Sequence, residues 1–121
     1  NETPLSFIPQ PRLATHVTYN FHPHKKKLIS LKNFTVQHHF FANQNRTVAY
    51  ELNSKSYNLI NTGLNCGITT KKITGELGVG VQNLLNKEYI DHLSALKTYE
   101  IPNTGRNFYL SLKLNINQKI K

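Results

Sequence analysis

Residues 107–116 read Asn-Phe-Tyr-Leu-Ser-Leu-Lys-Leu-Asn-Ile, and this stretch decides the fold of the chain. Large apolar residues occupy every second position, namely Phe108, Leu110, Leu112, Leu114 and Ile116. The positions between them are Asn107, Tyr109, Ser111, Lys113 and Asn115. Because successive side chains of a β-strand point to opposite faces, this period of two predicts a strand with one apolar and one polar face.

The same period recurs in four earlier stretches of the chain. It predicts five strands near residues 12–21, 28–43, 57–70, 73–86 and 106–116. In the second stretch, Ile29 and Leu31 have the opposite parity to Phe34 and Val36. A change of parity within one run indicates either a β-bulge near Lys32-Asn33 or a short paired turn. We therefore expect an all-β fold, an antiparallel up-and-down meander of about five long strands.

The connections between these strands alternate between short and long. Residues 22–27 and 71–72 form short connections, whereas residues 44–56 and 87–105 form long ones. Transmembrane β-barrels have this alternation, since they carry short periplasmic turns at one end and long extracellular loops at the other. On this rule the first and fifth strands run toward the periplasm. No apolar run approaches the ~20 residues of a membrane-spanning helix, so a membrane-spanning form of this chain would be a β-barrel segment.

A soluble β-sandwich with one buried face is the alternative fold. Strands of soluble proteins usually have about 5–6 residues, whereas a tilted membrane strand needs about 9–11. At least four of the five alternating runs reach ten residues. Strand length and loop alternation together favour the transmembrane barrel.

Charge and cysteine content exclude several classes of protein. The 15 Lys and Arg residues against 6 Asp and Glu give a net charge of +9, which can indicate a nucleic-acid partner. However, Lys25–Lys27 and Lys71–Lys72 lie beside turn residues and do not alternate with aromatic residues along one element. Cys66 is the only cysteine, so the chain has no disulfide framework, and we interpret Cys66 as a small apolar residue.

The residue types that carry chemistry form no catalytic pattern. The six carboxylates lack the spacing of an acid/base pair. The pair in His22–His24 falls in a short connection, and His38 and His39 are adjacent, so on a strand they point to opposite faces. His92 follows Asp91 in the last long connection, where it either touches a substrate metal or is solvated and hydrogen-bonded locally. We predict no catalytic, cofactor-binding or metal residue, no cofactor and no enzymatic activity, and leave substrate-binding residues unassigned.

Several motifs resemble the C-terminal barrel region of TonB-dependent outer-membrane receptors. Residues 80–89 read Gly-Val-Gln-Asn-Leu-Leu-Asn-Lys-Glu-Tyr, similar to the family's penultimate strand and its Asn-Leu-x-Asn-Lys-x-Tyr exit. Residues 101–108, Ile-Pro-Asn-Thr-Gly-Arg-Asn-Phe, resemble the Pro-Gly-Arg-x-aromatic start of the final strand. Residues 91–97, 56–61 and 9–13 are similar to a loop and to the starts of earlier strands in the family. The resemblance covers nearly the whole chain in order.

This resemblance implies a transport function. Receptors of this family are barrels of about 22 strands whose lumen is closed by an N-terminal plug domain. The chain would be the C-terminal part of such a barrel, a fragment without the plug, in the bacterial outer membrane. Its partners would be outer-membrane lipid, the remaining barrel, the plug, TonB acting through the plug, and a substrate such as a ferric siderophore or other metal complex, without nucleic acid. The alternative is a soluble basic β-domain that binds nucleic acid or an anionic glycan.

Four residues around the last connection carry specific expectations. Asn83 and Asn86 are expected to turn the chain out of the sheet by hydrogen-bonding their own backbone. Tyr89 suits the aromatic girdle at the membrane boundary. Gly105 would permit a positive φ before the last strand. Arg106 would place a charge at the outer rim, where it meets lipopolysaccharide phosphate or a loop carboxylate, or remains solvated.

The last connection and the C-terminal tail carry two further expectations. Tyr89, Leu93, Leu96 and Tyr99 recur near helical spacing, which predicts a short helical turn within residues 87–105. Family members commonly end on an aromatic residue that the barrel-assembly machinery reads. This chain departs from that pattern in residues 117–121, Asn-Gln-Lys-Ile-Lys, so the recognition signal is altered or the tail is unusual.

Overall fold

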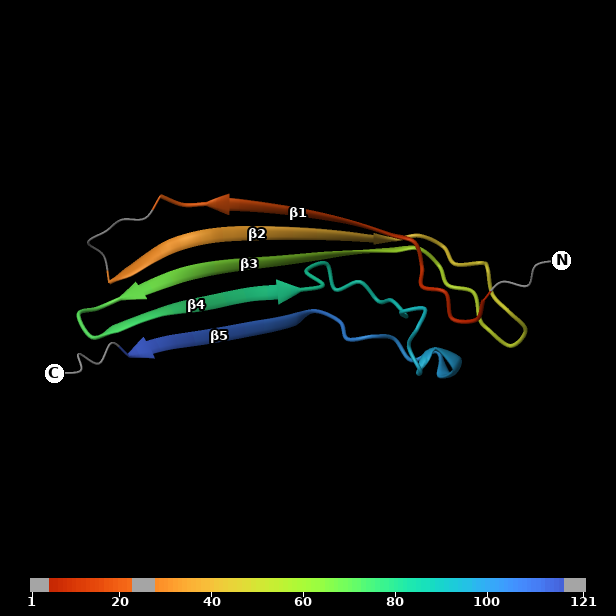
Figure 1. Cartoon of the computed structure of the whole chain (residues 1–121). Coiled ribbons are helices and arrows are strands. Elements are labelled where there is room, and N and C mark those ends of the chain that lie inside the picture. The colour runs from red at the N-terminus through yellow and green to blue at the C-terminus, as the bar shows by residue number, and fades with distance from the viewer. Residues whose placement is uncertain (1–4, 23–27, 117–121) are drawn as a thin grey trace.

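The computed structural model describes residues 5–22 and 28–116, which form one antiparallel sheet of strand order β1-β2-β3-β4-β5 (Figure 1). The strands are β1 Arg12–Asn20, β2 Ile29–Phe41, β3 Tyr57–Thr69, β4 Ile73–Gln82 and β5 Asn107–Ile116. The predicted all-β, up-and-down fold of five long strands is confirmed. The sheet is open, with β1 and β5 as its two edges.

The irregularity expected in β2 is present. The register between β2 and β3 shifts between Leu31 and Asn33, and β2 continues through this point, so the parity change is a bulge and not a turn. The predicted boundary of β4 at residue 86 is wrong, because the strand ends at Gln82. The next residue, Asn83, has a φ of 49°, which takes the chain out of the extended conformation.

The strand register gathers apolar side chains from all five strands on one face of the sheet. Val17 pairs with Val36 and Val79 pairs with Leu110, and directly paired residues share a face. The apolar side chains of this face are Leu13, Val17, Tyr19, Ile29, Leu31, Phe34, Val36, Phe40, Ile60, Leu64, Cys66, Ile68, Ile73, Leu77, Val79, Val81, Phe108, Leu110, Leu112, Leu114 and Ile116. The opposite, polar face carries the intervening residues.

The described residues contain no second layer that covers the apolar face. Phe108 is 71% exposed and Leu110 is 72% exposed. Every residue of the edge strands β1 and β5 is exposed. Tyr57 is the only hydrophobic side chain of the described segments that is buried. The sheet therefore has no hydrophobic core of its own.

On the polar face, glycines make room for the ring of Tyr109. Tyr109 pairs with Gly80, which pairs with Gly63 on the next strand. A Cβ at Gly80 would lie 2.4 Å from the Tyr109 ring, and a Cβ at Gly63 would lie 2.8 Å from its hydroxyl oxygen. The ring therefore covers backbone that the two glycines leave bare.

The connections separate into a short-turn end and a loop end of the sheet (Figure 1). At the short-turn end, Thr70 N–H donates to the carbonyl oxygen of Ile73 over 2.8 Å and closes the turn through Lys71-Lys72. The other short connection, with Lys25–Lys27, lies almost wholly outside the described residues, as does the C-terminal tail 117–121. At the loop end, the last connection forms the 3-10 helix η1 Lys97–Tyr99, which confirms the predicted short helical turn. Within the described part of the chain, no helix has the length and apolar character to cross a membrane.

Candidate functional site

The loop end holds most of the buried side chains of the described structure, and it is therefore the candidate site. The buried residues here are Gln10, Gln44, Ser54, Tyr57, Asn83 and His92. They come from three segments that are far apart in sequence, residues 5–11, 42–57 and 83–106. We call this assembly the loop cluster.

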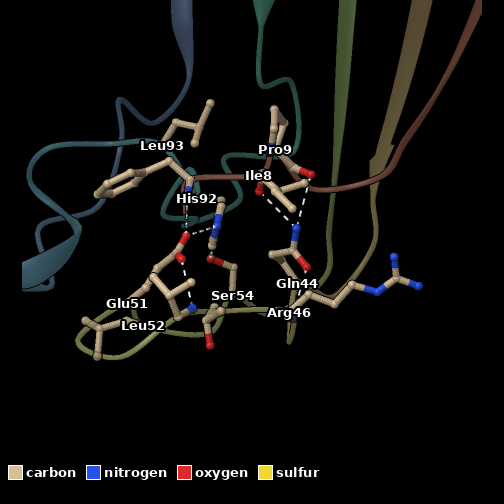
Figure 2. A network of polar contacts seen from close by, with 12 residues as sticks. Ile8, Pro9, Gln44, Arg46, Glu51, Leu52, Ser54, His92 and Leu93 are labelled. Carbon is tan, nitrogen blue, oxygen red and sulfur yellow. Dashed lines mark hydrogen bonds and ion pairs between the residues drawn. The ribbon is translucent and has the colours of Figure 1, made fainter. Parts of the chain in front are cut away.

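Two glutamines attach the N-terminal segment to the first long connection. Gln10 Nε2 donates to the carbonyl oxygens of Ala42 over 2.8 Å and Lys55 over 3.1 Å. In the other direction, Gln44 Nε2 donates to the carbonyl oxygen of Ile8 over 2.9 Å (Figure 2). Side-chain amides can satisfy irregular backbone in this way, because they carry both donors and an acceptor. These hydrogen bonds fix the two segments to each other without any contact from the last connection.

His92 joins the last connection to the segment of residues 42–57 (Figure 2). Its Nδ1 lies 2.9 Å from Ser54 Oγ, and its Nε2 lies 3.0 Å from Glu51 Oε1. The side chains of His92 and Glu51 are only 2% and 6% exposed. Of the expectations for His92, hydrogen bonding within the protein is found. It is not local, however, because Ser54 and Glu51 are 38 and 41 residues away in sequence.

Glu51 is the acceptor at the centre of the cluster. Its carboxylate accepts the backbone N–H groups of Phe7 over 3.1 Å and Val48 over 3.2 Å, in addition to the contact with His92. Burial alone would raise the pKa of Glu51, but the hydrogen bonds from Val48, His92 and Phe7 together hold this pKa below its ordinary value. Glu51 is therefore ionised and can only accept. It follows that Nε2 of His92 carries the imidazole proton.

Lys97 occupies the other side of the imidazole. Its Nζ lies 2.9 Å from His92 Nδ1 and also donates to the carbonyl oxygen of Leu52. Burial lowers the pKa of Lys97, while the charges of Glu51 and Asp91 oppose this change. The unprotonated Nδ1 thus faces two donors, the Ser54 hydroxyl and the Lys97 ammonium.

The order Ser54, His92, Glu51 matches that of a nucleophile, base and carboxylate in acyl-transfer enzymes. In such a site the lone pair of the base must be free to take the proton of the serine. Here Lys97 also donates to that lone pair, and Ser54 is itself buried. The geometry is that of a structural contact between loops.

Aromatic rings form the boundary between the loop cluster and the sheet. Phe41 and Tyr57 stack at 4.5 Å, and Tyr57 and Tyr89 pack at 4.8 Å between ring centroids. Phe41 pairs with Arg12 and Tyr57, which places the stack on the polar face. The expected position of Tyr89 in a lipid-facing girdle is therefore wrong, because Tyr89 packs against the buried Tyr57 on the polar side of the sheet. Burial and the nearby Asp91 raise the pKa of Tyr89.

An open depression of about 620 Å³ lies beside this stack. Tyr57 and Tyr89 line it, together with the lysines Lys55, Lys87 and Lys97. Lys97 thus belongs both to the wall of the depression and to the contact with His92.

Asn83 turns the chain out of the sheet through nearby backbone, as expected, whereas the side chain of Asn86 bonds a backbone group distant in sequence. Both have positive φ, and the Asn83 side chain accepts from the N–H and donates to the carbonyl oxygen of Lys87, each over 2.8 Å. Asn86 Oδ1 accepts the N–H of Arg106 over 2.9 Å. The expectation for Gly105 is wrong, since no described glycine has a positive φ. Gly105 is needed for space instead, because a Cβ there would lie 2.8 Å from Asn86 Oδ1.

The remaining candidate side chains lie apart from the loop cluster. His38 shares the apolar face with Ile60 and bonds Asn58 Oδ1 over 2.8 Å, whereas His39 belongs to the polar face, so their opposite orientation is confirmed. His22 is exposed, and His24 lies outside the described residues. Arg106 is exposed and has no ion pair with another described residue, which favours a solvated rim position. Within residues 5–22 and 28–116, no three His, Cys, Asp or Glu side chains gather to hold a metal ion.

Sequence reasoning singled out His92 but missed Glu51, Ser54 and Lys97. Glu51 and Ser54 come from another connection, and Lys97, five residues after His92, belongs to no motif that links it to His92. Comparison with models of known protein families, with curated proteins and with solved structures found no match to this chain. The resemblance to TonB-dependent receptors therefore rests on the motifs in the sequence.

Proposed function

We propose that this chain forms part of the barrel wall of a TonB-dependent outer-membrane transporter that takes up a scarce nutrient, such as a ferric siderophore or another metal complex. The observation that supports this most strongly is the apolar face, which spans all five strands and is not covered by the described residues. Burying one large apolar side chain is worth roughly 1.5–3 kcal/mol. Lipid acyl chains would provide this burial for a sheet that has no second layer.

The lengths of the strands suit this location. The strands have between 9 and 13 residues. At about 3.3 Å per residue and a tilt of about 40°, they would span roughly 23–33 Å of membrane, compared with an apolar band of about 25 Å on transmembrane barrels. Strands β2 to β5 thus reach the height of this band, and β1, with 9 residues, falls slightly short of it.

The two edges also support a wall that continues beyond this chain. β1 and β5 present unpaired backbone N–H and C=O groups along one side, which a neighbouring strand can satisfy. In such a barrel the polar face would line the lumen, and the loop cluster would lie outside the cell. TonB would act through the plug domain, and outer-membrane lipid would contact the apolar face.

The alternative, a soluble basic β-domain that binds nucleic acid or an anionic glycan, requires a cover for the same apolar face. It would need a second layer over residues as widely separated as Leu13 on β1 and Leu112 on β5. No such layer occurs in the described part of the chain. We therefore prefer the transporter.

The test uses the organism and the intact parent gene. Cells are fractionated and the parent protein is located by antibody, and a disruption strain is assayed for uptake of labelled ferric siderophores and other metal complexes under starvation. We expect the protein in the outer membrane and the loss of uptake of at least one chelate, restored by the intact gene. Recovery of the parent protein in a soluble fraction would overturn the proposal.

A further inference from the structure

The loop cluster contains a contact that a proton can compete with. The Lys97 ammonium and a proton both require the lone pair of His92 Nδ1, because Nε2 already carries its hydrogen toward Glu51. Histidine is the side chain whose ordinary titration falls between about pH 5 and pH 8. A proton bound at Nδ1 would therefore displace Lys97 from this lone pair.

We propose that Lys97 is an acid-released latch. It holds the last connection against residues 51–54 when His92 is neutral, and it detaches from these residues when His92 is protonated. In the neutral state Lys97 links His92 Nδ1 to the carbonyl oxygen of Leu52. A proton on Nδ1 removes the acceptor and brings two positive charges to within about 3 Å, where they repel each other strongly at low solvent exposure.

The other groups around the imidazole keep their contacts after protonation. Glu51 remains an acceptor for the Nε2 hydrogen, now as an ion pair. Ser54 Oγ can rotate its hydrogen and accept from Nδ1, since a hydroxyl both donates and accepts. Asp91, the neighbour of His92 in sequence, faces the Tyr57 hydroxyl over 3.4 Å and does not reach the imidazole. Lys97 loses Nδ1 as an acceptor and keeps only the carbonyl oxygen of Leu52, beside the new positive charge.

Release has a defined structural consequence. Lys97 begins the 3-10 helix η1, so its detachment frees the segment from Ser94 to Ile101 from Leu52. Lys97 also lines the depression beside Tyr57 and Tyr89, and its movement would enlarge the opening of this depression. The contacts from Glu51 to Phe7 and Val48 do not involve Lys97 and would remain. The latch is thus a local device and does not depend on the proposed transport function.

The direction of the pH dependence follows from linkage. Only the released state accommodates the extra proton on His92, so falling pH favours release and rising pH favours closure. Within the titration range, the ratio of released to closed molecules should rise by up to about tenfold per pH unit. The backbone N–H groups of Lys97, Tyr99 and Glu100, which bond within the turn, report this ratio.

The experiment measures amide hydrogen exchange of the whole 121-residue chain in detergent micelles at about pH 5 and about pH 8, with rates corrected for intrinsic exchange. For the native chain we expect lost protection of residues 97–101 in acid and unchanged protection of the Glu51 amide. Lys97→Met removes the charge and the donors, so these residues should exchange fast at both pH values. Lys87→Met is the matched control, since Lys87 lines the same depression without contacting His92, and it should respond like the native chain.

Three results would overturn the proposal. The first is an acid response of Lys97→Met equal to that of the native chain. The second is a loss of protection in acid that extends equally to Glu51. The third is independent of any variant: the nitrogen resonances of His92 at about pH 8 must report a proton on Nε2, and a proton on Nδ1 would contradict the latch.

Discussion

The body of the sheet and the loop cluster are stabilised in opposite ways. In the sheet, backbone hydrogen bonds connect five strands, but both faces are open and the edge strands are exposed throughout. In the loop cluster, side chains such as His92 and Glu51 are buried and join segments that are distant in sequence. The difference shows that the sheet depends on its surroundings to cover its apolar face, whereas the loop end supplies its own interior.

The largest expected effect is on the dispersion of the isolated chain. The uncovered apolar face exceeds the few hundred Å² that soluble monomers tolerate, and the +9 charge is concentrated in turns and tails, away from the strand centres. We expect the 121-residue chain to be insoluble or oligomeric in plain buffer and dispersed in detergent. Light scattering and sedimentation measure this. A monomer with cooperative unfolding in detergent-free buffer would favour the soluble β-domain.

The next effect separates the two faces of one strand. Leu112 lies on the apolar face and is 58% exposed, whereas its neighbour Ser111 lies on the polar face. In a lipid or detergent environment, Leu112→Lys should lower the free energy of unfolding by about 2–4 kcal/mol, because a charge on the lipid side must be desolvated. Ser111→Lys is the matched control and should change it by less than about 0.5 kcal/mol. Equal effects in denaturant titrations would show that the faces are not distinguished.

A smaller effect is expected from the packing of Tyr109 on glycine. Gly80→Ala would place a Cβ 2.4 Å from the Tyr109 ring and 2.5 Å from the carbonyl oxygen of Thr62. We expect a loss of about 1–3 kcal/mol, because a rigid ring and backbone must move. Gly67→Ala, whose Cβ would meet the flexible end of Lys32 at 3.0 Å, should cost less. Denaturant titration of both variants in micelles checks the order, and a larger cost at Gly67 would contradict this packing.

The smallest effect concerns the base of the last connection. Asn86→Ala loses the acceptor for Arg106 N–H and leaves alanine at a φ of 51°, which costs about 1–2 kcal/mol. This cost should appear as faster hydrogen exchange of Arg106, with little change in the sheet. Arg106→Gln, at an exposed side chain, should alter the unfolding free energy by less than about 0.5 kcal/mol. A larger cost for Arg106→Gln would indicate that this side chain has a partner.

The sequence predicts the sheet more completely than it predicts the loop cluster. Strand positions, the β2 bulge and the turn at Asn83 follow from alternation and turn chemistry, which act over a few residues. The pairing of His92 with Glu51 and Ser54 depends on how two long connections fold over each other, and no local pattern encodes it. Local rules predicted a positive φ at Gly105 and a membrane-boundary position for Tyr89. The observed environments depend instead on residues distant in sequence, because Asn86 restricts the space at Gly105 and Tyr57 packs against Tyr89.

Cys66, the only cysteine of the chain, allows the most direct test of the claim that the apolar face meets lipid. Cys66 pairs with Leu31 and Leu77 on the apolar face, whereas its neighbour Asn65 lies on the polar face. The chain is refolded into vesicles with a small fluorophore on Cys66, and separately on Asn65→Cys in a Cys66→Ser background. We predict that lipids brominated in their acyl chains quench the label on Cys66 strongly, and that aqueous iodide quenches the label at position 65. Strong quenching of the Cys66 label by iodide, with none by brominated lipid, would contradict the account.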